Sequence, residues 1–332
     1  MRILVIGGTR FVGRHIAATA VERGHDVTLF NRGVTDPSLF SDVRQVRGDR
    51  RAGGLAALRD RSFDVVVDPS AYFPADVEAA AGVAADRYVL ISSCSVYRDP
   101  VAPGSDEDAP TYEVAGPAPD TIESPEAYGA LKARCERVAG ARFPGRALVI
   151  RPGLVVGPHD HTERFAYWPR RVARGGRVLA GEPEQPAQLI DARDLAAWVI
   201  ASVESETVGV FNAVGPARPL TMAQLLATCA AVARSDADVV WVGDRFLLDH
   251  GVEPWADLPL WLPADAAGFL AVDATRARRA GLRTRPVAET IADVLGWDAT
   301  RDPAERHDAM PGDRERELLA AYDRARGERR VS

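Results

Sequence analysis

The chain has 332 residues, 46% of them hydrophobic, and a formal net charge of −6. This length suffices for a sizeable buried core in two lobes or in one large α/β domain. The acidic balance disfavours nucleic acid as the main partner, because neutralising phosphates requires a concentrated basic surface. We therefore expect a small-molecule substrate and no nucleic-acid partner, and we leave a homodimer open.

The cysteines and the apolar runs bear on the cellular compartment. Cys94, Cys135 and Cys229 lie far apart and lack metal-ligand spacing, so the sequence predicts neither a disulfide framework nor a zinc site. The apolar run at residues 3–6 is too short for a signal peptide, and no later run approaches the length of a membrane span. We expect a cytoplasmic protein with no membrane partner.

The N-terminal segment has the pattern of a strand-helix-strand unit. Residues 2–6 form a continuous apolar run, which is typical of a strand buried on both faces of a parallel sheet. A glycine-rich loop follows, then an amphipathic segment that stops before Gly24, and then a second strand at residues 26–30. Such a loop lets the backbone approach a pyrophosphate at the N-terminus of the helix. The loop residues that we assign to a dinucleotide are Gly7, Thr9, Arg10, Phe11, Val12 and Gly13.

Three positions bear on which dinucleotide binds. The acid that usually ends the second strand and accepts hydrogen bonds from the ribose 2′-hydroxyl is absent, since Asn31 and Arg32 stand there. Arg10 occupies the middle glycine position of the loop and adds a second guanidinium. These residues favour NADP(H) over NAD(H), although a solvated loop position for Arg32 remains open. Asp49, after the third strand, is expected to meet the adenine edge.

Strands are predicted next at residues 43–46, 64–68 and 87–91, and the last of them runs into Ser92-Ser93-Cys94-Ser95-Val96-Tyr97. Ligands of open α/β sheets bind beyond the carboxyl ends of the strands, so these hydroxyls should emerge where a nicotinamide lies. Residues 99–124 are rich in proline, glycine and acids. A loop of this length in a compact domain is usually functional, and we expect it to act as a lid.

Lys132 is the single lysine of the chain, and 40 of the 41 basic residues are arginine. A planar guanidinium cannot replace a compact ammonium that forks between a ribose and a phenol, so this usage favours chemistry at residue 132. Ser124, Pro125 and Glu126 have the pattern of a helix start, which puts Tyr128 and Lys132 on one helix face. An ordinary surface pair is the alternative.

The second half of the chain predicts a smaller lobe. Residues 147–150 form a further strand, and residues 163–176 form a helix. We predict no metal site, because His159 and His161 have no evident third ligand. We place them at the mouth of a cleft, and the residues expected to touch substrate are Cys94, Ser95, His159, His161 and Trp168. The aromatic residues Trp241, Phe246, Trp255 and Trp261 form either a core or a pocket wall.

The order of the motifs resembles that of the extended short-chain dehydrogenase/reductases. These motifs are residues 7–13 (GGTRFVG), 92–97 (SSCSVY), 128–132 (YGALK) and 151–158 (RPGLVVGP). The chain is most similar to the atypical branch known as NAD-dependent epimerase/dehydratase-like, from residue 1 to about residue 300. The resemblance implies catalytic roles for Ser93, Tyr128 and Lys132, with Lys132 also contacting the cofactor.

The implied fold is an α/β Rossmann fold, a doubly wound parallel sheet with a smaller, interleaved C-terminal substrate lobe. We place the dinucleotide-binding domain at residues 1–157, with 187–214 returning to it. The substrate lobe comprises residues 158–186 and 215–300, and a charged helix and tail occupies residues 301–332.

Two departures from the family pattern limit the substrates and reactions that we expect. Leu154 stands where nucleotide-sugar epimerases carry an asparagine, and Cys94 and Ser95 replace the Asp-Glu pair of the dehydratases. We therefore expect an NADP(H)-dependent oxidoreductase that interconverts a carbonyl and an alcohol. The alternatives are an epimerase, sugar or sugar-nucleotide like, that retains its cofactor, and a non-catalytic nucleotide- or RNA-binding relative.

Overall fold

A computed structural model describes residues 1–36, 38–113, 116 and 118–331. The chain divides into two compact units. Unit 1 comprises Met1–Val155, Leu189–Gly215 and Val272–Thr284, and unit 2 comprises Val156–Gln188, Pro216–Ala271 and Arg285–Ser332.

Unit 1 contains a seven-stranded sheet in which every neighbouring pair is parallel. The strand order is β10-β6-β5-β4-β1-β2-β3. The strands are β1 (Arg2–Ile6), β2 (Asp26–Asn31), β3 (Arg44–Arg47), β4 (Ser62–Asp68), β5 (Ala84–Ile91), β6 (Ala147–Pro152) and β10 (Gly209–Ala213). The order reverses between β1 and β4, and open α/β sheets bind their ligands at such a point. The predicted Rossmann-type sheet is confirmed.

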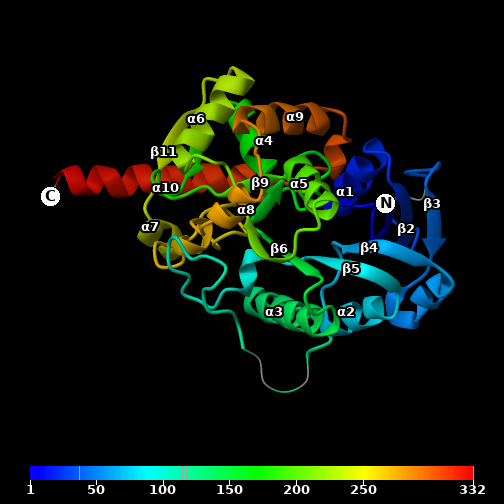
Figure 1. Cartoon of the computed structure of the whole chain (residues 1–332). Helices are drawn as coiled ribbons and strands as arrows, with labels where there is room; N and C mark the ends of the chain where they lie inside the picture. The colour runs from blue at the N-terminus through cyan, green and yellow to red at the C-terminus, as the bar shows by residue number, and fades with distance from the viewer. Residues whose placement is uncertain (37, 114–115, 117, 332) are drawn as a thin grey trace. The chain divides into compact units, whose positions relative to one another are not determined.

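Helices cover both faces of this sheet (Figure 1). On one face α1 (Phe11–Glu22) and α5 (Ala192–Glu204) pack together, and their core includes Ile16 and Trp198. On the other face α2 (Pro74–Ala81) and α3 (Pro125–Arg142) pack together, with Cys135 and Ala139 buried. This double cover explains the almost continuous apolar runs of β1 and β4. Unit 1 also contains α8 (Thr275–Arg279) and the pairing of β7 (Leu154–Val156) with β9 (Leu189–Asp191).

The first part of the expected lid forms hydrogen bonds with other segments of unit 1. An isolated antiparallel bridge joins Tyr97 to Thr111, and the Tyr112 N–H donates to the Val96 carbonyl over 2.9 Å. Glu107 is buried, and its Oε1 accepts a hydrogen bond from the Asn212 N–H over 2.8 Å. Glu107, Thr111 and Tyr112 therefore have partners within unit 1. Residues 114, 115 and 117 of the expected lid lie outside the described residues.

Unit 2 is mostly helical. Its helices are α4 (Tyr167–Ala173), α6 (Met222–Ala233), α7 (Asp244–Asp249), α9 (Val287–Ala299) and α10 (Gly312–Val331), and its strands β8 (Arg177–Ala180) and β11 (Asp238–Trp241) pair in parallel. The capping box predicted at Thr221 and Gln224 is present. Trp261 is buried and donates to Asp244, so this aromatic residue belongs to the core. Among the described helices, none is long and apolar enough to cross a membrane.

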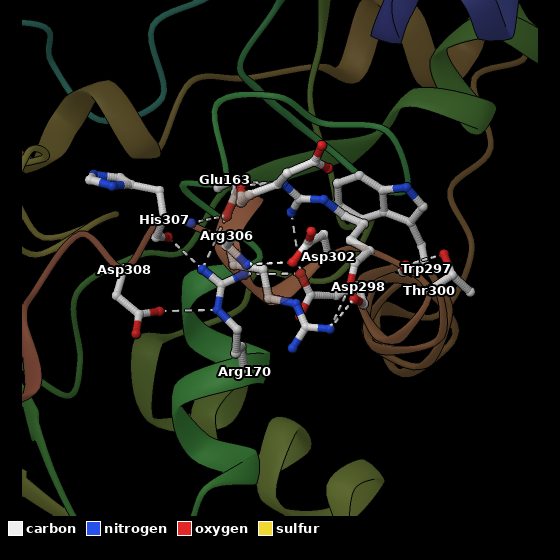
Figure 2. A network of polar contacts seen from close by, with 12 residues as sticks. Glu163, Arg170, Trp297, Asp298, Thr300, Asp302, Arg306, His307 and Asp308 are labelled. Carbon is white, nitrogen blue, oxygen red and sulfur yellow. Dashed lines mark hydrogen bonds and ion pairs between the residues drawn. The ribbon is translucent and has the colours of Figure 1, made fainter.

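The helix predicted at residues 163–176 is shorter than expected and begins at Tyr167. Glu163 has a left-handed φ of 55°, which a helix does not tolerate. Its carboxylate instead joins a cluster centred on Arg170 of α4 (Figure 2). Arg170 also forms ion pairs of 3.0 Å with Asp298 and with Asp308. Three carboxylates from different segments therefore meet one buried guanidinium, which attaches the segment after α9 to α4.

Candidate active site

The glycine loop after β1 has the geometry of a dinucleotide cradle. Gly7 has a φ of 109°, which favours glycine, and a Cβ at this position would lie 3.0 Å from Ser70 Oγ. A Cβ at Gly13 would lie 3.2 Å from the backbone nitrogen of Gly8, so the start of α1 packs directly on the loop. The helix itself offers no acceptors to the N–H groups of its first turn. The residues present therefore fit a bound pyrophosphate.

The carboxyl end of β2 presents the residues expected to choose between cofactors. Asn31 is buried, and its Oδ1 accepts a hydrogen bond from the Gly33 N–H over 2.8 Å. Arg32 is exposed. Asp49, which the sequence assigned to the adenine, is exposed, and its Oδ1 accepts from the Arg51 N–H over 2.9 Å, so this carboxylate caps a short 3₁₀ turn.

Sequence reasoning missed Arg47 at this strand end. Arg47 lies in register with Asn31 across the parallel pair β2 and β3, and its Nη1 donates to the Gly33 carbonyl over 3.4 Å. A Cβ on Gly33 would come within 1.9 Å of that nitrogen. The strand prediction contained the signal, because parallel strands end at the same edge, but residue 47 lay one position beyond the strand expected there.

Two backbone carbonyls of unit 1 hold the side chain of Lys132 in place. Its side chain is buried, and Nζ donates to the carbonyls of Ala71 and Ile91, both over 2.7 Å. Ala71 follows β4 and Ile91 ends β5, so the ammonium lies at the carboxyl edge of the sheet. Burial lowers the pKa of Lys132, and the nearby acidic groups oppose this effect. An ammonium has three donors, so two backbone bonds leave one for a ligand.

Helix α3, which carries Tyr128, packs without an intervening side chain on the serine loop at residues 92–97. A Cβ on Gly129 would lie 2.0 Å from the Ser95 carbonyl oxygen, so only glycine permits this approach. The ring of Tyr128 lies 6.4 Å from that of Tyr72. Burial raises the pKa of Tyr72, and the charge of Arg10 opposes the rise.

The three neighbouring serines have different surroundings. Ser93 Oγ accepts from the Ser95 N–H over 3.1 Å and lies 3.0 Å from the Ser95 hydroxyl. Ser92 is buried and donates to Glu136 over 2.5 Å, so its hydroxyl points to the interior of unit 1. Of these three serines, Ser93 and Ser95 are partly exposed and Ser92 is not.

Two residues expected to touch substrate are interior instead. Cys94 is fully buried, its Sγ donates to the Arg151 carbonyl over 3.3 Å, and burial raises the pKa of its thiol. Trp168 of unit 2 is fully buried, and its Nε1 donates to the Pro259 carbonyl over 2.8 Å. The place of a residue in the sequence does not reveal on which side of the backbone its side chain lies.

The histidines of unit 2 flank a buried carboxylate. His159 has a φ of 69°, and its ring packs edge-on against Trp297 at 5.7 Å. His161 is exposed, and Asp160 between them is buried and accepts two hydrogen bonds from Thr162. Within the described ranges, no three histidine, cysteine or acidic side chains form a group that could hold a metal ion.

Comparison with known proteins gives both sequence and structural relatives, although no family model matches the chain. The epimerase family protein SDR39U1 of Bos taurus is 27% identical over 246 residues, or 68% of this chain and 78% of that protein. The chloroplast stem-loop binding protein of 41 kDa b of Arabidopsis thaliana is 31% identical over 126 residues, or 32% of this chain and 33% of that protein.

Further relatives extend this comparison. The 2-alkyl-3-oxoalkanoate reductase of Stenotrophomonas maltophilia is 32% identical over 182 residues, or 48% of this chain and 52% of that protein. The crystal structure of the Thermus thermophilus UDP-glucose 4-epimerase complex with NAD superposes with a TM-score of 0.63 at 20% identity, covering 91% of this chain and 100% of that one, which shows the shared fold. In its motifs, its fold and these relatives, the chain is similar to the epimerase/dehydratase-like short-chain dehydrogenase/reductases.

Proposed function

We propose that this enzyme interconverts an alcohol and a carbonyl on a small-molecule substrate with NADP(H). The observation that carries the proposal is the fixed ammonium of Lys132, which two backbone carbonyls hold on the helix face that presents Tyr128. The single lysine of the chain thus lies at the sheet edge where dinucleotides bind.

The proposed roles follow from the acid-base properties of the side chains. A phenol has a pKa of about 10 and is a poor base at neutral pH, but a neighbouring positive charge favours the phenolate. Lys132 supplies that charge, Tyr128 gives or takes the substrate proton, and Ser93 holds the substrate oxygen by a hydrogen bond. A bound nicotinamide supplies hydride exchange at its C4 position.

Ser93→Ala should reduce turnover far more than Ser95→Ala. Both hydroxyls lie in the same loop, 3.0 Å apart, so either substitution removes their mutual hydrogen bond, and in our proposal only Ser93 binds the substrate oxygen. Steady-state turnover of a panel of carbonyl substrates measures the difference. Equal losses in the two variants would mean that the loop acts as a structural unit and would remove Ser93 from the mechanism.

NADPH should bind more tightly than NADH, because Arg32, with Arg10 and Arg47 near the same sheet edge, can pair with a 2′-phosphate. One charge-assisted hydrogen bond contributes about 1.5–3 kcal/mol, or roughly 10- to 150-fold in affinity. Arg32→Asp should abolish or invert the preference, since the new carboxylate repels the phosphate and accepts from a ribose hydroxyl. Arg10→Ala should only weaken it.

Fluorescence titration of the wild type and both variants with the two reduced cofactors measures this preference. Arg23→Ala, at the far end of α1 from the glycine loop, is the matched control and should change neither affinity. Equal affinities in the wild type, or tighter NADH, would refute NADP(H) selection and leave the ribose to Asn31.

An epimerase that retains its nucleotide is the second candidate, and the names of the epimerase relatives favour it. Leu154 opposes a sugar-nucleotide substrate, since it is apolar and buried in β7 where nucleotide-sugar epimerases carry an asparagine. Purified protein that carries nucleotide absorbance and shows no net turnover of added cofactor would select the epimerase. Net oxidation of added NADPH by a carbonyl compound would select the reductase.

A further inference from the structure

The face of α3 that carries Tyr128 and Lys132 continues one turn further to Glu136. Residues four apart lie above one another on a helix, so these three side chains form a row. Ser92 Oγ donates to Glu136 Oε1 over 2.5 Å. Because Ser92 directly precedes Ser93, this hydrogen bond joins the catalytic helix to the strand end that carries the catalytic hydroxyl.

Arg151, at the end of β6, holds the other side of the Glu136 carboxylate. Its Nε and Nη2 donate to that carboxylate over 3.0 and 2.7 Å, and the two side chains are only 6% and 10% exposed. Arg151 Nη1 donates to the Tyr97 hydroxyl over 3.1 Å, and the Arg151 carbonyl accepts from Cys94 Sγ. Arg151 therefore contacts the middle and the end of the serine loop as well as α3.

The stability of a buried ion pair does not account for this arrangement. Desolvation offsets most of the attraction between two buried charges, and apolar residues of similar volume often serve stability as well. A bidentate pair does, however, fix distance and orientation. At Gly129 the helix touches the backbone of Ser95 directly, so a displacement of α3 changes the position of Tyr128 relative to Ser93.

We propose that Glu136 and Arg151 are positioning residues that set the spacing between Tyr128, Lys132 and Ser93. The inference rests on the proposed function, because it requires that these three side chains act together. Neither Glu136 nor Arg151 touches the reacting atoms in this role. A misplacement of about 1 Å can cost roughly 100-fold in rate, so the pair should matter for turnover more than for folding.

The ionisation of Tyr128 tests this role without a known substrate. It is measured as the tyrosinate absorbance of each protein minus that of the same protein carrying Tyr128→Phe, which removes the signals of Tyr72 and the other tyrosines. Glu136→Gln keeps an acceptor for Ser92 and removes the charge that holds Arg151. We expect Tyr128 to ionise about one pH unit higher in this variant, because the Lys132 ammonium is no longer held at its wild-type distance from the Tyr128 hydroxyl.

The direction of that shift separates two explanations. Loss of the Glu136 charge by itself favours the phenolate and would move the ionisation of Tyr128 to lower pH. Displacement of Lys132 moves it to higher pH. NADPH affinity should stay within about threefold, while turnover of carbonyl substrates should fall roughly 10- to 100-fold.

Two further variants complete the experiment. Arg142→Gln, at the end of α3, breaks an exposed ion pair with Glu78 of α2 and should change neither the ionisation nor turnover. The double variant Glu136→Gln with Arg151→Met also removes the guanidinium that has lost its opposite charge, and we expect it to regain thermal stability but not turnover.

Three results would overturn the positioning role: full activity in the double variant, wild-type ionisation and turnover in Glu136→Gln, or a shift of Tyr128 to lower pH. Unchanged turnover in Tyr128→Phe would instead refute the proposed function. The two failures are therefore distinguishable.

Discussion

Tyr128→Phe should leave nicotinamide-nucleotide binding nearly intact while turnover falls by orders of magnitude. The substitution removes one oxygen and keeps the ring that packs beside Tyr72, so only the proton path is lost. General acid-base catalysis contributes roughly 10²- to 10⁴-fold, which sets the expected loss. Cofactor titration by fluorescence and steady-state turnover of carbonyl substrates measure the two quantities separately.

The matched control is Tyr72→Phe, which deletes a hydroxyl from the neighbouring ring 6.4 Å away and should cost far less. Lys132→Arg should lose activity together with Tyr128→Phe. Nζ is buried between two carbonyls at 2.7 Å, and a planar guanidinium cannot reproduce that geometry in the same volume. Full activity of the arginine variant would refute the argument from lysine usage.

The sheet was predictable because its local patterns agree with its tertiary surroundings. The strands β1 and β4 are almost continuous apolar runs, and burial on both faces is the condition that produces such runs. The helix of Tyr128 was predictable from its cap, since Ser124 accepts a hydrogen bond from the Ala127 N–H as the sequence pattern requires.

The features that the sequence did not predict depend on contacts between distant residues. Glu136 and Arg151 are 15 residues apart and lie on different elements, so no local pattern marks them as partners. Arg170 meets carboxylates 7, 128 and 138 residues away. The shortened helix α4 has the same origin, because an apolar periodicity cannot reveal that Glu163 leaves the helix to pair with Arg170.

Arg170→Ala should destabilise unit 2 by about 3 kcal/mol. Removing one partner of a buried ion pair typically costs about 3–5 kcal/mol, because the remaining charge stays buried without compensation. The Arg170 and Glu163 side chains are 7% and 6% exposed. We expect the lower end of the range, because Arg301 still pairs with Glu163 and Asp298 after the substitution. Urea unfolding followed by tryptophan fluorescence measures the change.

Tryptophan fluorescence suits this measurement, because Trp198 alone of the six tryptophans lies in unit 1. The matched control is Arg174→Ala. Arg174 also pairs with Asp308, but its side chain is 47% exposed. Exposed ion pairs contribute about 0–1 kcal/mol, so this variant should unfold near the wild-type urea concentration. Equal destabilisation by the two substitutions would contradict the central place of Arg170 in the cluster.

The destabilisation by Arg170→Ala should be larger near neutral pH than at low pH. Burial raises the pKa of Asp308, but the hydrogen bonds and charges of Arg174 and Arg170 outweigh it and hold the pKa below its usual value. A carboxyl with a lowered pKa contributes stability above its unfolded pKa of about 4, and this contribution is lost as the pH falls through the folded pKa. The difference between wild type and Arg170→Ala should therefore be largest near neutral pH and should narrow below about pH 4. A difference that stays constant across this range would mean that Arg170 stabilises unit 2 by packing and not by its charge.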